Sequence, residues 1–229
     1  MFFGTVEKPP RLSEFELEVP EKLIADHPSQ RRDGCKLMVL DTKEETITHR
    51  KFSNIVDYFN KGDVLVVNNT KVYPARLYAT KDRSSSKVEV FLLRELSSDL
   101  WEAMVKPARK VRIGNKLIFG EGIECDVIDN TISGGRVLRF EHNTENLHKF
   151  IEKNGLSPLP PYIKRDPIPS DKKNYQTVYA TERGSVAAPT AGIHFSNALL
   201  KKIKAKGVKI ANVTLHIGLG TFKPIMVED

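Results

Sequence analysis

The segments around His194 and His216 combine a histidine with small residues, a pattern suited to proton transfer at a bound ligand. His194 comes near the end of GSVAAPTAGIHF (184–195), in which eight small residues surround one valine. His216 lies in TLHIGLGTFKP (214–224), just before a Gly-x-Gly turn. Histidine can give or take a proton near neutral pH, and small side chains let a ligand approach the backbone. Tight packing of the small residues and a structural role for His216 are equally open interpretations.

Two further segments offer polar groups at the edges of apolar runs. Arg32 and Asp33 precede the apolar run KLMVLD, where Arg32 could grip a carboxylate or phosphate and Asp33 could accept from hydroxyls. A surface salt-bridged turn is the alternative for this pair. Asn68 and Asn69 end the apolar run VLVVNNT (64–70), as expected of a buried strand that delivers polar side chains at its carboxyl edge.

These candidates need elements that position them, and the pattern predicts an α/β arrangement around them. Strands are expected at 36–41 (buried), 46–52 (half-buried), 64–70 (buried) and 208–218, with short helices within 12–27 and at 54–63. A helix over 144–155 would be capped by Thr144 and closed by Gly155. A second helix over 196–207 would start at Ser196 and end at Gly207, so that the small-residue loop leads into a helix N-terminus.

Between about residues 74 and 143 the pattern changes to short strand-like runs separated by Gly, Ser and Asn turns. Strands at that spacing without helical periodicity predict a small antiparallel barrel. The stretch from Ala103 to Gly120 within it has five basic residues and no acidic one. It is either an RNA-binding face or an ordinary solvated barrel face.

The composition fits a protein with a substantial core. The chain has 229 residues, of which 40% are hydrophobic, and no apolar run is long enough to cross a membrane. Cys35 and Cys125 are far apart and show no metal-ligand spacing, so we expect a reduced, cytoplasmic protein. The net charge of +7 suits a polyanionic partner. The proline-rich arm LSPLPPYIKRDPIP (156–169) presents Tyr162, Lys164 and Arg165, or is simply a rigid connector.

Five motifs, taken together and in order, resemble one family. NNTKVYPARL, PLPPYIKR, YQTVYA, GSVAAPTAGIHF and TLHIGLGTF are similar to those of the S-adenosylmethionine:tRNA ribosyltransferase-isomerases of queuosine biosynthesis, from Leu12 to Asp229. Lys36 stands where the family usually has Arg, Asn69 where it often has Asp, and residues 1–11 are additional. The family continues past the final Val-Glu-Asp, so we expect this chain to be a fragment that folds through its barrel but shows little ribosyl transfer.

The resemblance implies an α+β, multi-domain fold: an α/β main domain (1–73 and 144–229, incomplete at its C-terminus) interrupted by a β-barrel insert (74–143). It implies transfer and isomerisation of the ribosyl group of S-adenosylmethionine onto 7-aminomethyl-7-deazaguanine at the tRNA wobble position. The products would be epoxyqueuosine-tRNA, adenine and methionine. The donor and tRNA would be the partners of a monomer with no prosthetic group, no metal and no membrane contact. A non-catalytic, basic RNA-binding module is the alternative.

The resemblance also implies roles for individual residues. His194 and His216 would transfer protons, without an assignment of acid or base, and Asp33 would orient a ribose hydroxyl. Arg32 and Arg76 would hold a carboxylate or phosphate, Asn68 and Asn69 a base edge, while Tyr175 and Tyr179 would stack on a base or, alternatively, fill the core. Further substrate-binding residues would be Thr190, Gly192, Gly218, Gly220 and Thr221, and RNA-binding residues would be Lys106, Arg109, Lys110, Arg112, Lys164 and Arg165.

Overall fold

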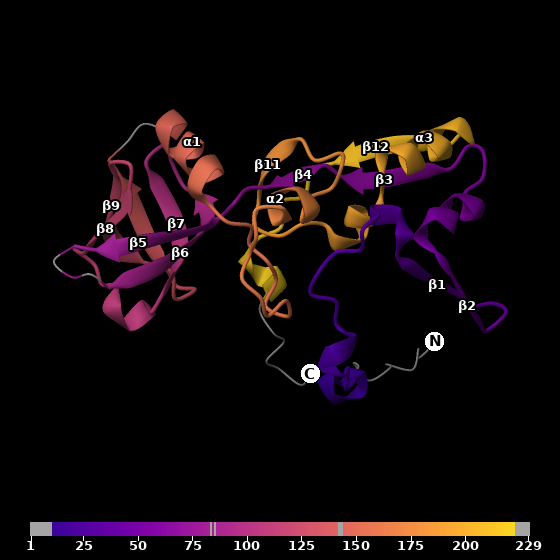
Figure 1. Ribbon diagram of the computed structural model, residues 1–229, viewed down its shortest axis with the longest axis horizontal. Helices are drawn as coiled ribbons and strands as arrows, with labels where there is room; N and C mark the ends of the chain where they lie inside the picture. Colours follow the sequence, from indigo (N-terminus) through magenta and orange to yellow (C-terminus); the bar gives the residue numbers. More distant parts are fainter. Residues whose placement is uncertain (1–10, 83, 85, 142–143, 223–229) are drawn as a thin grey trace, which may run out of the picture.

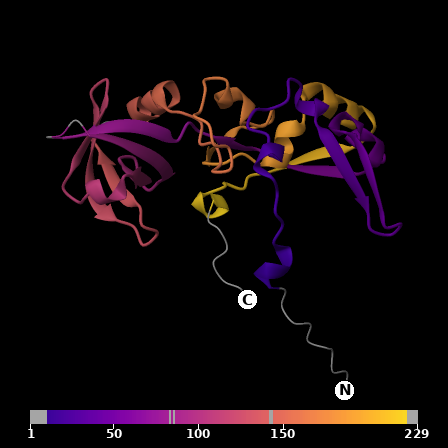
Figure 2. The same cartoon turned by 60° about the horizontal axis from the view of Figure 1, so that its bottom comes forward.

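A computed structural model describes residues 11–82, 84, 86–141 and 144–222. A barrel lies at one end of the molecule and an α/β part at the other (Figure 1). The two ends stay apart when the view is turned, with the segment that carries the proline-rich arm between them (Figure 2). The predicted class, an α/β body with an antiparallel barrel, is therefore confirmed, whereas the predicted domain boundaries stay a prediction.

The barrel is closed by six antiparallel strands in the order β10-β7-β6-β5-β8-β9. Alternate residues of each strand point inward, so that Val88, Val90 and Leu92 of one strand are fully buried. The strands are β5 (Arg76–Lys81), β6 (Lys87–Glu95), β7 (Leu100–Lys106), β8 (Lys116–Gly120), β9 (Ile123–Asn130) and β10 (Arg136–Phe140).

Helix α1 (Thr144–Asn154) packs against the barrel through Leu147 and Ile151, which belong to the barrel's core cluster. The chain then returns to the barrel entrance, where Arg76 and Leu156 exchange backbone hydrogen bonds of 3.2 and 2.8 Å. A Cβ on Gly155 would lie 2.0 Å from the carbonyl oxygen of Pro74, so glycine is required for this close approach. The predicted helix is confirmed, with Thr144 as its first residue.

Parallel strand pairs organise the α/β part. Strand β3 (Val64–Asn68) pairs with β12 (Lys209–Val213), and β4 (Thr70–Val72) pairs with β11 (Glu182–Ser185). Helix α3 (Asn197–Ala205) leads into β12 and is capped by Ser196, whose Oγ accepts from the Leu199 amide at 3.1 Å. Gly207 follows it with a φ of 87°, which confirms the predicted helix end.

Several predicted elements differ in detail. The strand over 36–41 is β1 (Lys36–Asp41), which pairs with β2 (Thr46–Lys51), but it is not buried: Met38 and Leu40 are 65% and 60% exposed. Strand β3 alternates, with Val64 and Val66 exposed and Val67 buried. Both strands belong to two-stranded sheets with only one face covered, so alternate side chains point outward. The strand predicted over 208–218 ends at Val213.

The remaining elements are short. The helix predicted over 54–63 is the 3-10 turn η4 (Phe52–Tyr58), and the opening segment holds only η1 (Leu12–Phe15) and η2 (Glu21–Leu23). The other short elements are η3 (Arg32–Gly34), η5 (Ala108–Lys110), α2 (Asp171–Asn174), η6 (Thr190–His194) and η7 (Leu219–Phe222). Among the described residues, no helix has the length and apolar character needed to span a membrane.

Candidate functional site

Four of the sequence motifs meet in space around one cavity. The backbone amide of Val186 donates to the carbonyl oxygen of Ile217 at 3.0 Å, which joins the small-residue loop to the Gly-x-Gly segment. The proline-rich arm and Tyr175 close the other side. The cavity of about 530 Å³ is lined by Pro160, Pro161, Tyr162, Tyr175, Ala187, Ala188, Pro189, Thr190, Ile217, Thr221 and Phe222.

A second cavity, of about 460 Å³, shares Tyr162, Tyr175 and Thr190 with the first. Because three wall residues are common, the two cavities adjoin. The second cavity brings in His194 from the end of η6 and His27 from the N-terminal segment. Each volume lies in the range of small-molecule sites, roughly 300–1,000 Å³.

The imidazole of His194 is half-buried on this wall. Its ring centroid lies 5.2 Å from that of Phe52, at a tilt of 41°. In the described part of the chain no hydrogen bond engages either ring nitrogen, so both nitrogens are available to a ligand. This is the arrangement expected of a proton-transfer group awaiting its substrate.

His216 is held in a very different way. Its Nδ1 lies 2.8 Å from Thr70 Oγ1, and Thr70 Oγ1 lies 2.7 Å from Ser185 Oγ. The backbone of Gly184 runs against the ring, since a Cβ there would lie 2.6 Å from His216 Cε1. Thr70 and Ser185 are fully buried, whereas His216 is exposed. The ring is therefore anchored on its Nδ1 edge and open on the other.

The small residues of the loop are used partly for packing. A Cβ on Gly192 would lie 2.2 Å from the hydroxyl of Tyr179, so only glycine fits beneath that ring. Gly218 and Gly220 have open space around them. Thr190 and Thr221 line the first cavity, as their predicted role in substrate binding requires.

The guanidinium of Arg32 lines the second cavity but already bonds to backbone carbonyl oxygens, so its hold on a carboxylate or phosphate stays a prediction. Nη1 donates to the carbonyl oxygens of Gln176 and Ile193 at 2.7 and 3.2 Å, and Nη2 donates to that of Lys173 at 2.5 Å. Those donors are the ones a bidentate grip on a carboxylate would need. Arg32 instead ties η3 to the segments that carry Tyr175 and His194.

The two asparagines after β3 bond to other segments of the protein, and their role in reading a base edge stays a prediction. Asn68 Nδ2 donates to the carbonyl oxygen of Leu215 at 2.9 Å, and its Oδ1 accepts from the amides of Thr70 and Leu215. Asn69 bonds to the hydroxyls of Thr181 and Thr214 at 3.0 and 2.7 Å. Both amides are used to join the strand ends.

The charged groups of Asp33 and Arg165 are also engaged in hydrogen bonds within the protein. Asp33 is buried; its Oδ2 accepts from Ser196 Oγ at 2.8 Å, a hydrogen bond that lowers the pKa of the carboxyl. Arg165 forms a bidentate pair with Asp171 at 2.7 and 2.8 Å and also donates to the carbonyl oxygen of Asp26. Asp33 thus supports the helix cap and Arg165 fixes the proline-rich arm, and the ligand and RNA roles expected of them stay predictions.

Tyr175 and Arg76, two further predicted ligands, differ in burial: Tyr175 is buried and Arg76 is half-buried. Tyr175 is buried beside Val72 and Leu159, and burial raises the pKa of its hydroxyl to about 12. It also lines both cavities, so stacking on a base stays a prediction. Arg76 lies on β5, with its Nε 3.7 Å from Glu89 Oε1, and is not among the residues that line the two adjoining cavities.

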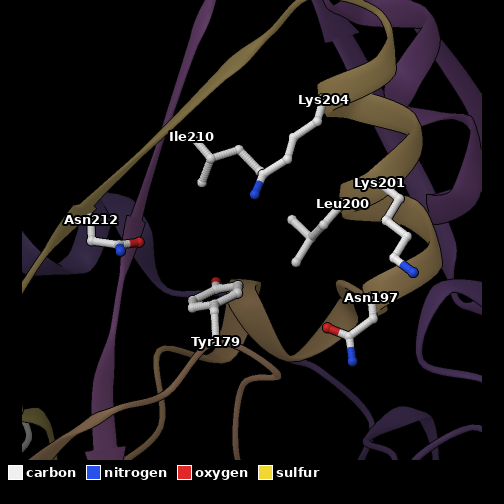
Figure 3. A pocket seen from close by; sticks show the side chains of 7 residues that line it. All are labelled: Tyr179, Asn197, Leu200, Lys201, Lys204, Ile210 and Asn212. Carbon is white, nitrogen blue, oxygen red and sulfur yellow. The ribbon is translucent and has the colours of Figure 1, made fainter.

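Tyr179 lines a third hollow of about 510 Å³, between α3 and β12 (Figure 3). Lys204 of α3 and Ile210 of β12 face this hollow, and Asn212 follows on the same strand (Figure 3). It shares no lining residue with the two adjoining cavities. The structure therefore separates Tyr179 from Tyr175, which sequence analysis had grouped.

The predicted basic face of the barrel is exposed. Within the described ranges, Lys106, Arg109, Lys110 and Arg112 have no carboxylate partner. Lys116, from the same acid-free run, is instead paired with Glu124 and Glu141 at 2.8 and 2.9 Å. Lys164 is exposed and pairs with Glu21. The four unpaired residues form what we call the basic loop.

Sequence reasoning missed Thr70 and Ser185, the two hydroxyls behind His216. Both lie inside quoted motifs, but nothing in a single sequence shows that they meet across 115 residues. Among the described residues no group of three or more His, Cys, Asp and Glu side chains is placed to hold a metal ion.

The fold and the adjoining cavities define a class: an α/β protein that carries an antiparallel barrel and a candidate small-molecule site with a histidine on its wall. The family model described as "Queuosine biosynthesis protein" matches residues 12–229, and the chain belongs to this family.

The names of curated relatives agree with that assignment. The chain is 53% identical over 221 residues to the S-adenosylmethionine:tRNA ribosyltransferase-isomerase of Chloroherpeton thalassium, covering 96% of this chain and 64% of the relative. It is 48% identical to the protein of the same name from Thermosipho africanus, covering 96% and 63%. A crystal structure of the S-adenosylmethionine tRNA ribosyltransferase from Thermotoga maritima is 32% identical, with a TM-score of 0.36, covering 89% of this chain and 58% of that one. The chain thus spans just under two thirds of its curated relatives.

Proposed function

We propose that the protein transfers and isomerises the ribosyl group of S-adenosylmethionine onto 7-aminomethyl-7-deazaguanine at the wobble position of tRNA. Epoxyqueuosine-tRNA, adenine and methionine are the products. The observation that carries the proposal is the convergence of four motif segments on two adjoining cavities, with His194 on the wall. The name shared by the relatives supports the same reaction.

The chemistry needs proton transfer at two places. A base must take the proton next to the sulfonium, and adenine leaves more readily when a ring nitrogen receives a proton or hydrogen bond. His194 and His216 are the proposed groups. S-adenosylmethionine is the ribosyl donor and no prosthetic group takes part. Thr190 and Thr221 offer hydroxyls to the donor from the wall of the first cavity.

The proposed RNA contact is the basic loop on the barrel. Lys106, Arg109, Lys110 and Arg112 would meet phosphates, which positions the RNA without reading its sequence. Arg136 supports this loop, because its guanidinium donates to the carbonyl oxygens of Ala108 and Val111 at 3.0 and 2.9 Å. A cationic surface held in this way can guide the anticodon arm toward the cavities.

The test is release of adenine from S-adenosylmethionine, measured with and without tRNA that carries the aminomethyl base. The proposal predicts release that requires the precursor tRNA, with methionine and modified tRNA formed in equal amounts. Methyl transfer to the RNA, or no dependence on the precursor base, contradicts it.

A non-catalytic RNA-binding module is the second candidate, favoured by the unpaired basic loop. It predicts salt-sensitive binding of tRNA with no adenine release, even when enzyme and tRNA are equimolar. The same assay therefore separates the two functions.

A further inference from the structure

The hydroxyls behind His216 form a directional chain. Ser185 Oγ accepts a hydrogen bond from the backbone amide of Ile217 at 2.8 Å. Its own proton must then go to another acceptor, and Thr70 Oγ1, at 2.7 Å, is in reach. Ser185 is fully buried, so in the opposite arrangement its proton would be unpaired and shielded from water.

The direction of the hydrogen bond from Ser185 to Thr70 also determines the direction of the next one, between Thr70 and His216. Thr70 Oγ1 accepts from Ser185 and has one proton of its own to donate. Its other neighbour is His216 Nδ1, at 2.8 Å. Thr70 is also fully buried, so its proton goes to Nδ1. Nδ1 is then an acceptor, and the proton of a neutral imidazole must sit on Nε2.

We propose that Ser185 and Thr70 are positioning residues that hold His216 as the Nε2–H tautomer, so that its exposed edge presents a hydrogen-bond donor. Gly184 supports the arrangement by letting its backbone lie against the ring. An acceptor on the ligand, such as a heterocycle ring nitrogen or an oxygen, is the group that this edge would recognise.

The chemical consequence rests on the proposed function. A donor at Nε2 suits the departing adenine, whose ring nitrogen accepts a hydrogen bond as the glycosidic bond breaks. It does not suit the abstraction of a proton beside the sulfonium. In this tautomer the basic lone pair of the imidazole is on Nδ1, where it accepts the hydrogen bond from Thr70. The base is then His194, for which no hydrogen bond occupies either ring nitrogen among the described residues.

The test is a long-range ¹H–¹⁵N spectrum of the uniformly labelled chain at pH 8, where an ordinary histidine is neutral. Loss of one signal set in His216→Gln assigns the residue. The expected wild-type spectrum has an unprotonated Nδ1 and a protonated Nε2. In Thr70→Val the ratio of Nε2–H to Nδ1–H should fall roughly tenfold, whereas Thr70→Ser should keep it.

Thr177→Val is the matched control, because Thr177 is a buried threonine whose hydroxyl has no partner among the described residues. It should leave the His216 signals unchanged. A wild-type proton on Nδ1, or a fall of less than threefold in Thr70→Val, overturns the proposal. The wild-type spectrum decides the tautomer even if Thr70→Val does not fold. The spectrum does not depend on turnover. The proposed tautomer of His216 can therefore be refuted without refuting the proposed reaction, and the reverse also holds.

Discussion

The barrel and the α/β part differ in how completely their strands are paired and their apolar side chains are buried. In the barrel, six strands of one continuous segment close on themselves, and residues such as Leu92 and Leu138 are completely buried. In the α/β part, each sheet has two strands, and Met38 and Val66 remain exposed. The α/β part has smaller hydrophobic clusters, one of them around Phe195 and Ile203, and polar contacts of residues such as Arg32 and Asn68 also join its distant segments.

This difference explains where the chemistry lies. A closed barrel has no free sheet edge and no room inside, so it can offer only its outer surface to a ligand. The α/β part is assembled from segments more than a hundred residues apart, and such junctions leave cavities. The barrel is suited to hold a large polyanion, and the junction is suited to hold a small molecule.

The largest expected effect tests the barrel core. Leu92→Ala should lower the free energy of unfolding by about 2–5 kcal/mol, because it leaves a cavity among fully buried side chains. Met38→Ala, on the exposed face of β1, is the matched control and should change it by less than about 0.5 kcal/mol. Urea unfolding of both variants measures this, and equal effects would remove the distinction between the two regions.

The next effect tests a buried polar contact of the α/β part, the ion pair between Arg165 and Asp171. Asp171→Asn should cost roughly 1.5–3 kcal/mol at neutral pH, because it weakens charge-assisted bonds to Arg165 in a buried position. The hydrogen bonds from Arg165 lower the pKa of Asp171, so its contribution is present above the unfolded pKa of about 3.9 and is lost as pH falls through the folded value.

Unfolding measured between pH 7 and pH 2 checks this pH dependence. Wild type and Asp171→Asn should differ by a constant amount above about pH 5 and converge at the acid end. A difference that is unchanged at pH 2 would mean that the charge of Asp171 does not contribute.

A smaller effect, on the affinity for tRNA, tests whether the barrel or the α/β part holds the RNA. Replacing the four residues of the basic loop with glutamine should flatten the dependence of tRNA affinity on salt by roughly 0.7–0.9 log units per lost phosphate contact. The loss should be similar for cognate and non-cognate tRNA, since these contacts read no sequence. Affinity for S-adenosylmethionine should barely change.

The comparison variant carries the same replacement at Lys201, Lys202 and Lys204 of α3, which are exposed on the α/β part. If this variant flattens the salt dependence and the basic-loop variant does not, the RNA lies along the α/β part instead. Lys106→Gln, measured separately, shows whether the residue at the strand end contributes.

The fold was largely predictable because its signals are local. Turn residues at regular spacing indicated the barrel, and Ser196 and Gly207 marked both ends of α3. Burial was not predictable in the same way. An apolar run such as 36–41 does not say how many faces of its sheet are covered, and here one face is open.

The sequence predicted which segments form the candidate site better than it predicted which side chains face the cavities. His194, Thr190 and Thr221 line the adjoining cavities. Arg32 and Arg165 also line one of them, but their guanidinium groups already bond to other parts of the protein, as do the side chains of Asp33 and Asn68. A polar side chain beside a strand end can meet either a ligand or a distant backbone group. Only the three-dimensional structure shows which partner satisfies it.

The most direct test of the central claim is the rate of adenine release in His194→Ala, made in a protein of the full length of the relatives and compared with wild type and with the control Thr177→Val. If His194 transfers a proton at the donor, the rate with precursor tRNA should fall by roughly 10²-fold or more, with melting unchanged. A near-normal rate in a variant that melts like wild type would contradict the assignment, because His194 would then serve only the packing beside Phe52.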